Sequence, residues 1–205
     1  MLRSILFTFF LAWGVLAQAA GPGTILVWGD SLSAGYGLKA EQAWPALLQS
    51  QLRREGFQHT VVNASVSGET TAGGRSRLPR ALADYKPSVV VVELGANDGL
   101  RGLPPQLMAE NLQAMLAMAR QAGARTLLVG MELPPNYGAA YVTRFQQTYA
   151  QVAQTQPTAF VPFLFEGFAA RQELFQSDGI HPTAEAQPLI LQTVWKSLKP
   201  LLAPR

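Results

Sequence analysis

The sequence predicts a single α/β domain, a three-layer α/β/α sandwich built on a five-stranded parallel sheet. Short β-rich apolar segments alternate with segments whose apolar residues recur at helical spacing along nearly the whole chain. Strict alternation of this kind produces parallel strands joined by right-handed crossovers, with helices on both faces of the sheet. With 48% hydrophobic and 14% charged residues, the 205-residue chain can fill one core, and its composition excludes intrinsic disorder.

The first 19 residues are predicted to be a signal peptide. Arg3 supplies a positive charge, residues 5–16 are almost entirely apolar, and Ala17-Gln18-Ala19 has the small-x-small pattern that signal peptidase reads. An uncleaved membrane anchor is the alternative, but the apolar run is shorter than the roughly 20 residues that span a bilayer. We therefore expect cleavage after Ala19 and a mature domain, residues 20–205, that is periplasmic or secreted and not stably inserted in a membrane.

The first half of the chain contains three predicted strands and the helices between them. Residues 24–28 form a β-rich apolar run, and residues 44–52 carry apolar side chains at helical spacing, with a proline in the first turn. A second strand is predicted at 60–62, followed by a helix through 78–85. The third strand, 89–92, consists of four valines and is apolar on both faces, as a strand covered by helices on each side must be.

The second half continues the alternation. We expect a helix over 108–119, a strand at 126–129, a helix over 142–152, a short fifth strand at 159–161 and a final helix over 191–198. Methionines in these helical stripes more often fill a core than bind a cofactor, so no chemistry is assigned to them.

Polar residues follow the first three predicted strands at one edge of the sheet, where ligands of parallel sheets bind. Ser31 and Ser33 follow the first strand, Gly68 the second and Asn97 the third. A serine at a strand-to-helix turn can present its hydroxyl above the sheet, while Gly68 and Asn97 can offer N–H donors. Each position also has a structural interpretation: a helix cap for the serine segment, a turn glycine, and an asparagine bonded to its own backbone.

The chain has two histidines, His59 and His181. His59 lies beside the start of the second strand, where we expect an exposed structural imidazole. Asp178 precedes His181 by three residues, with Gly179 between them, so this segment can fold back and let the carboxylate accept from one ring nitrogen. The other nitrogen is then free to accept a proton from a nucleophile. The alternative is a loop at a helix start, in which Asp178 caps the turn.

Composition and missing motifs exclude several classes of function. The absence of cysteine excludes a catalytic thiol, a thiolate metal site and a disulfide scaffold. No His-x₃-His pair or cluster of acidic ligands predicts a metal, and no glycine-rich phosphate loop predicts a nucleotide, so we expect no cofactor. A net charge of +3 with one tight arginine group does not indicate a nucleic-acid partner.

Four short blocks of sequence together resemble a known family. They are Gly29-Asp30-Ser31-Leu32-Ser33, Asn63-Ala64-Ser65 through Gly68, Gly95-Ala96-Asn97-Asp98, and Asp178-Gly179-Ile180-His181-Pro182. In this order, on an alternating β/α chain, they resemble the SGNH, or GDSL, hydrolases, and the resemblance runs from Ile25 to about Leu201. Trp44-Pro45-Ala46-Leu47-Leu48 and Leu133-Pro134-Pro135-Asn136-Tyr137-Gly138 are similar to the periplasmic thioesterase I/protease I/lysophospholipase L1 group within that family.

The resemblance implies a flavodoxin-like SGNH hydrolase fold and a serine hydrolase that forms an acyl-serine intermediate. It implies that Ser31 is the nucleophile, His181 the base and Asp178 the residue that orients the base. The implied oxyanion hole consists of the Ser31 N–H, the Gly68 N–H and the Asn97 side chain. The substrates implied are small acyl compounds: acyl-CoA-type thioesters, lysophospholipids, and aryl or alkyl esters.

The loop after the third strand is the expected substrate-binding segment. Its candidate residues are Gly99, Leu100, Arg101, Leu103 and Pro104. Phe163, Phe165 and Phe168 could line an acyl groove or pack in the core. Two other functions stay open: a carbohydrate O-acetylesterase, and a non-catalytic lipid- or sugar-binding module on the same fold. We expect a monomer.

Overall fold

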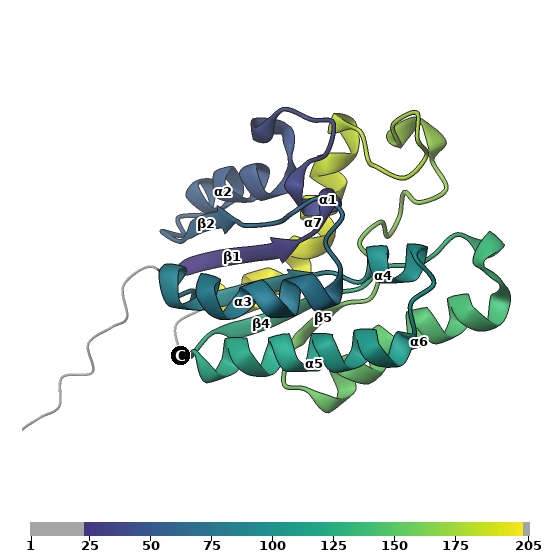
Figure 1. The fold of residues 1–205 in the computed structure, drawn as a ribbon. Coiled ribbons are helices and arrows are strands. Elements are labelled where there is room, and N and C mark those ends of the chain that lie inside the picture. Colours follow the sequence, from purple (N-terminus) through teal and green to yellow (C-terminus); the bar gives the residue numbers. More distant parts are fainter. Residues whose placement is uncertain (1–22, 203–205) are drawn as a thin grey trace, which may run out of the picture.

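The computed structural model describes residues 23–202 and confirms the predicted architecture, a five-stranded parallel sheet between two layers of helices (Figure 1). The signal peptide predicted at residues 1–19 lies outside the described residues. All neighbouring strands pair in parallel, in the order β2-β1-β3-β4-β5. The strands are β1 (Thr24–Gly29), β2 (Thr60–Asn63), β3 (Val89–Glu93), β4 (Arg125–Val129) and β5 (Ala159–Val161).

Seven α-helices of the described chain connect and cover these strands. The helices α2 and α7 pack together on one face of the sheet, while α5 packs between α3 and α6 on the other (Figure 1). Among residues 23–202, no helix is long and apolar enough to cross a bilayer. The helices are α1 (Ser31–Ala34), α2 (Trp44–Arg54), α3 (Thr71–Tyr85), α4 (Ala96–Leu100), α5 (Pro105–Gln121), α6 (Ala139–Thr155) and α7 (Gln187–Leu198).

The helix expected through residues 78–85 begins earlier, at Thr71. Thr70 caps it by accepting a hydrogen bond from the Gly73 N–H at 3.3 Å, and the helix continues through Pro79. Two glycines and a proline weaken the local helical signal of this segment. The burial of Leu78 and Ala81 in the core outweighs that local preference, because packing supplies most of the stability of helices in proteins.

The sheet register places the carboxyl ends of β1 and β3 at the same level, with the end of β2 two residues earlier. Gly29 of β1 pairs with Glu93 of β3, and Val27 of β1 pairs with Asn63 of β2. The segments that follow these strands therefore leave the sheet side by side at its carboxyl edge. Because β1 and β3 lie inside the sheet and are buried along nearly their whole length, this edge is anchored in the core.

Candidate active site

The serine half of the site is formed by the turn from β1 into α1. Asp30 is the residue that caps α1, with its Oδ1 accepting from the Leu32 N–H at 3.0 Å. Ser31 is therefore the first helical residue, and its hydroxyl does not serve as the cap. Ser33 is fully buried and donates its hydroxyl to Glu93 Oε2 at 2.6 Å. Of the two candidate serines, the fold thus leaves only Ser31 accessible from the edge of the sheet.

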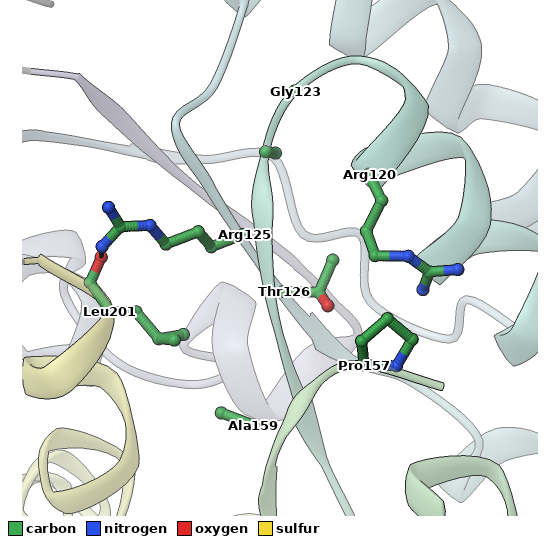
Figure 2. Close-up of a pocket in the computed structure, with 8 residues that line it drawn as sticks. Arg120, Gly123, Arg125, Thr126, Pro157, Ala159 and Leu201 are labelled. Atoms are coloured by element: carbon green, nitrogen blue, oxygen red, sulfur yellow. Dashed lines mark hydrogen bonds between the residues drawn. The ribbon is translucent and has the colours of Figure 1, made fainter. Parts of the chain in front are cut away.

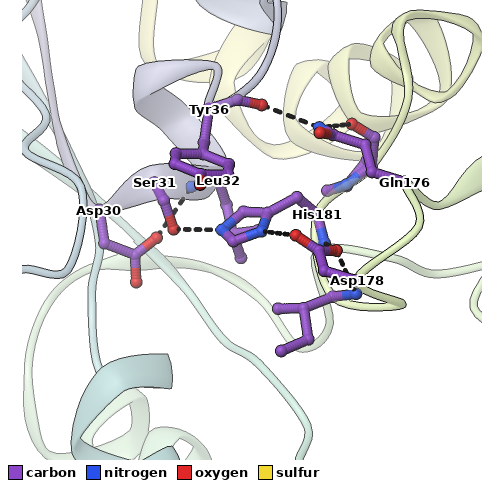
Figure 3. Close-up of polar contacts among 9 residues, drawn as sticks. Asp30, Ser31, Leu32, Tyr36, Gln176, Asp178 and His181 are labelled. Atoms are coloured by element: carbon purple, nitrogen blue, oxygen red, sulfur yellow. Dashed lines mark hydrogen bonds and ion pairs between the residues drawn. The ribbon is translucent and has the colours of Figure 1, made fainter.

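The histidine half comes from a loop near the end of the chain. His181 Nε2 lies 2.9 Å from Ser31 Oγ, across 150 residues of sequence, and His181 Nδ1 lies 2.7 Å from Asp178 Oδ2 (Figure 3). The other carboxylate oxygen, Oδ1, accepts from the backbone N–H groups of Ile180 at 2.9 Å and His181 at 3.0 Å. The two roles considered for Asp178, turn cap and imidazole partner, are both present, one on each oxygen.

Hydrogen bonds lower the pKa of the Asp178 carboxyl, which lies at the surface. The His181 backbone N–H is the largest cause that lowers the pKa of this carboxyl to about 2, and the imidazole and the Ile180 N–H add to it. An ionised Asp178 is an acceptor only, so it favours the tautomer of His181 that carries its proton on Nδ1. Nε2 is then an acceptor directed at the Ser31 hydroxyl.

Gln176 ties the histidine loop to the serine half. Its side-chain Nε2 donates to the Tyr36 carbonyl at 2.8 Å and to the Pro182 carbonyl at 3.1 Å, and its backbone N–H donates to the His181 carbonyl at 2.7 Å. The Tyr36 ring packs against the imidazole with 4.4 Å between ring centroids. Sequence reasoning missed both residues, because the bonds that join them run to backbone carbonyls, which any residue provides.

An aromatic cluster packs against the same loop. Phe165 packs against Phe168 and Phe175, with ring centroids 5.3 Å and 5.4 Å away. Phe165 and Phe168 are buried, and Phe175 forms an isolated bridge with Pro182 at the base of the loop. Of the two alternatives for these phenylalanines, the structure places Phe165 and Phe168 in the core.

The three candidate oxyanion donors, at Ser31, Gly68 and Asn97, belong to the segments that follow β1, β2 and β3. Gly68 has φ 78°, a left-handed conformation that favours glycine. Within residues 23–202, neither the Gly68 N–H nor the Ser31 N–H donates to a protein acceptor. Asn97, in the first turn of α4, donates its side-chain Nδ2 to Asp30 Oδ2 at 3.0 Å rather than bonding its own backbone.

Two buried carboxyl groups lie under the serine. Burial raises the pKa of Asp30 to about 6, opposed by the hydrogen bonds from Leu32 and Asn97. Burial and the nearby charge of Asp30 raise the pKa of Glu93 well above its ordinary value. Asp30 is therefore ionised at pH values above about 6, while the raised pKa of Glu93 favours its protonated form, and Glu93 Oε2 accepts from Ser33.

The candidate substrate loop divides into a buried and an exposed part. Gly99 is buried, and a Cβ there would lie 2.6 Å from the Phe145 ring, so its small size lets α4 pack on the core. Leu100 is half-buried, whereas Arg101, Leu103 and Pro104 are exposed.

Two hydrogen bonds hold the exposed part of this loop at the rim of the site. Arg101 Nη2 donates to the Gly68 carbonyl at 3.0 Å, and the Tyr141 hydroxyl donates to the Leu103 carbonyl at 2.7 Å. The first bond places Arg101 beside Gly68. A substrate role for these residues stays a prediction.

Two surface clefts lie away from the serine and the histidine. One, of about 330 Å³, lies at the amino ends of β4 and β5 and is lined by Arg120, Thr126 and Leu201 among others (Figure 2). The other, of about 440 Å³, includes His59, which is half-buried rather than exposed as expected, and burial lowers the pKa of its imidazole. No candidate catalytic or substrate-binding residue lines either cleft.

Comparisons with known proteins identify the family of this chain. Residues 27–188 match the GDSL-like lipase/acylhydrolase family. The chain is 51% identical over 201 residues to esterase TesA of Pseudomonas aeruginosa, covering 98% of this chain and 100% of that protein. It is 42% identical over 185 residues to thioesterase 1/protease 1/lysophospholipase L1 of Escherichia coli, covering 90% of this chain and 88% of the relative.

Solved structures extend the similarity to three dimensions. A crystal structure of TesA superimposes with a TM-score of 0.85 at 53% identity, covering 87% of this chain and 99% of that one. The psychrotrophic esterase EstA from Pseudoalteromonas, inhibited by monoethylphosphonate, gives a TM-score of 0.83 at 40% identity, covering 88% of this chain and 98% of that one.

Proposed function

The chain belongs to the GDSL-like lipase/acylhydrolase family, and we propose that it is a serine hydrolase of carboxylic esters and acyl thioesters. The observation that carries this proposal is the unbroken row of hydrogen-bonded side chains from Ser31 through His181 to Asp178. In this row a hydroxyl meets the acceptor nitrogen of an imidazole whose other nitrogen is held by a carboxylate. That arrangement activates an alcohol for attack on a carbonyl carbon.

The reaction begins with proton transfer from the serine. His181 Nε2 takes the hydroxyl proton of Ser31 as Oγ forms a bond to the carbonyl carbon of the substrate. The imidazolium so formed then protonates the leaving alcohol or thiol, and an acyl-serine remains. Water attacks the acyl group in the second half, with the same imidazole as base, and releases the carboxylic acid. Asp178 stabilises the imidazolium in both halves and stays ionised.

The second requirement of this chemistry is stabilisation of the negative charge that develops on the carbonyl oxygen. The N–H groups of Ser31 and Gly68 and the side-chain amide of Asn97 are the donors proposed to bind it. The two backbone donors have no protein acceptor within the described residues, and Asn97 keeps one of its two N–H bonds for the substrate. Donors fixed before the charge develops stabilise it without reorganisation.

The names of the relatives support the substrate class. The similar proteins are described as an esterase, an arylesterase and a thioesterase/lysophospholipase. We extend to this chain activity on aryl and alkyl esters, acyl-CoA-type thioesters and lysophospholipids. Arg101, Leu103 and Pro104 form the exposed rim beside Gly68 and are the proposed contacts of the acyl chain.

The first 19 residues support a proposed compartment. A charged start, an apolar stretch and Ala17-Gln18-Ala19 support export and cleavage, so we propose that the mature domain resides in the periplasm or outside the cell. Because the serine and the histidine come from the same chain, one copy supplies both groups, and a monomer suffices.

Covalent labelling tests the function directly. An alkyl phosphonate is incubated with the mature protein and with Ser31→Ala, and the intact masses are compared. The expected result is one adduct per chain in the wild type and none in the variant. A wild-type protein that takes up no label and hydrolyses no ester would refute the proposal. Values of kcat/KM for acyl-thioester, lysophospholipid and acetylated-sugar series then establish the substrate class.

A further inference from the structure

We propose that Asp30 is a positioning residue of the oxyanion hole, which holds the Asn97 amide and the helix that carries Ser31 in one fixed relation. Its Oδ1 accepts from the Leu32 N–H at 3.0 Å, and its Oδ2 accepts from Asn97 Nδ2 at 3.0 Å. One carboxylate thus contacts both the turn of the nucleophile and a side chain 67 residues away. This inference presupposes the hydrolase function proposed above.

The Asn97 amide needs such a partner because its side chain can adopt two orientations. Rotation about the terminal side-chain torsion exchanges its oxygen and its NH₂ group, and both ends have nearly the same size. Ionised Asp30 only accepts hydrogen bonds, so it selects the orientation in which Nδ2 faces it. The second N–H of that same nitrogen is then available to the carbonyl oxygen of the substrate.

Helix capping alone does not explain a buried carboxylate at this position. Asparagine and serine cap helices about as well as aspartate does and carry no charge. Asp30 is 0% exposed, and burial opposes its ionisation. What the carboxylate adds is acceptance on both sides at once, with no donor that could repel the amide of Asn97.

The variant Asp30→Asn separates the two contacts. Its oxygen can still cap α1 at the Leu32 N–H, but its NH₂ group then faces Nδ2 of Asn97, so the Asn97 amide must turn over or move. We expect kcat to fall by about 10²-fold, as when one oxyanion donor is lost, with KM nearly unchanged. Binding of an alkyl trifluoromethyl ketone, which forms a tetrahedral oxyanion on the serine, should weaken by the same factor.

Glu93→Gln is the matched control. It makes the same carboxyl-to-amide change in the neighbouring buried acid, whose side chain bonds Ser33 and contacts neither Leu32 nor Asn97 through a hydrogen bond. We expect its kcat and its affinity for the ketone to stay close to the wild-type values. An equal loss in both variants would show that a carboxyl-to-amide change at either buried acid has this effect, and would overturn the proposal.

A double exchange, Asp30→Asn with Asn97→Asp, gives the sharpest outcome. It restores a donor–acceptor pair between the two side chains but leaves no amide N–H for the substrate. We expect the melting temperature to recover relative to Asp30→Asn while kcat stays low. Recovery of kcat would overturn the proposal, because it would mean that only the contact between the side chains matters.

The failure of this inference can be told apart from failure of the proposed function. Wild-type protein that hydrolyses esters and takes up the phosphonate, together with Asp30→Asn at wild-type kcat, refutes the positioning role alone. Should Asp30→Asn not fold, Asp30→Ser replaces it, since serine caps α1 and supplies no carboxylate for Asn97.

Discussion

The two halves of the active site are held in place by different means. The serine half follows β1, a buried inner strand, and its carboxylate, Asp30, is fully buried with a pKa raised to about 6. The histidine half belongs to a surface loop, and its carboxylate, Asp178, is exposed with a pKa lowered to about 2. Burial raises the pKa of Asp30, whereas hydrogen bonds from the loop lower the pKa of Asp178. Two aspartates in one site therefore have pKa values shifted in opposite directions.

This difference indicates that the position of the serine half depends on the core, whereas the position of the histidine half depends on local hydrogen bonds. Changes in the serine half should alter both stability and rate, because they disturb the sheet edge. Changes in the histidine half should alter the rate with smaller effects on folding, because its loop is held by a few hydrogen bonds and by packing on Phe175. Four measurements test this contrast.

The largest effect is expected for Asp178→Asn. An asparagine oxygen can still accept from the loop N–H groups, but its NH₂ group faces His181 Nδ1 and favours the tautomer with the proton on Nε2. That tautomer cannot accept the proton of Ser31, so kcat should fall by about 10⁴-fold. Steady-state hydrolysis of an aryl ester measures the rate. A loss below tenfold would contradict the assignment of Asp178.

The second-largest effect on kcat is expected for Asn97→Ala. It removes one of the proposed donors to the carbonyl oxygen, and kcat should fall about 10²–10³-fold. It also leaves Asp30 Oδ2 without its partner in a buried site, so the free energy of unfolding should fall as well. Urea denaturation and ester hydrolysis on the same preparation test both parts. A lower rate with unchanged stability would show that Asp30 does not depend on this bond.

The pH dependence of stability should have opposite signs for the two carboxylates. The folded state raises the pKa of Asp30 from 3.8 to about 6, so this residue destabilises the fold as pH rises through that interval. Asp30→Asn removes this dependence, and its stability relative to the wild type should increase from pH 4 to pH 7 by on the order of 3 kcal/mol.

Asp178 should give stability the opposite dependence on pH. Its pKa is lowered from 3.8 to about 2, so it stabilises the fold above pH 4, and that stabilisation is lost as pH falls through about 2. Asp178→Asn should therefore lose stability relative to the wild type only above that range. Urea midpoints measured across pH give both curves, and curves of the same sign would remove the contrast between the two halves.

The smallest effect is expected for Gln176→Ala. It removes the two side-chain bonds to Tyr36 and Pro182 that tie the histidine loop to the segment after α1. A small displacement of the imidazole should lower kcat by about tenfold, within the 10²-fold that a 1 Å misplacement can cause. Gln106→Ala, on the exposed first turn of α5, is a control for loss of a glutamine. Equal rates in both variants would show that the loop holds its position without Gln176.

The sequence predicted most of this arrangement because the relevant signals are local or periodic. Alternating strands and helices predicted the sheet, and the rule that ligands bind at the carboxyl edge of parallel strands predicted that Ser31, Gly68 and Asn97 lie at that edge. The start of α3 was not predictable, because burial of Leu78 outweighs the glycines and the proline around it.

Contacts that depend on exact placement were also missed. Nothing in the residue pattern indicates that Asp30 bonds both Leu32 and Asn97, since aspartate before a helix is common for capping alone. Gly99 was predicted only as part of the substrate loop, and the sequence did not indicate that its lack of a side chain also allows α4 to pack against Phe145. Such constraints arise only when two distant segments meet.

The 150 residues between Ser31 and His181 have a consequence for synthesis and export. A chain still emerging from the ribosome, or threaded unfolded through a membrane channel, possesses the nucleophile long before it acquires the base. Ester cleavage can begin only when the last loop has settled onto the first turn. If the chain is exported as proposed above, hydrolysis should therefore begin only after the exported chain has folded.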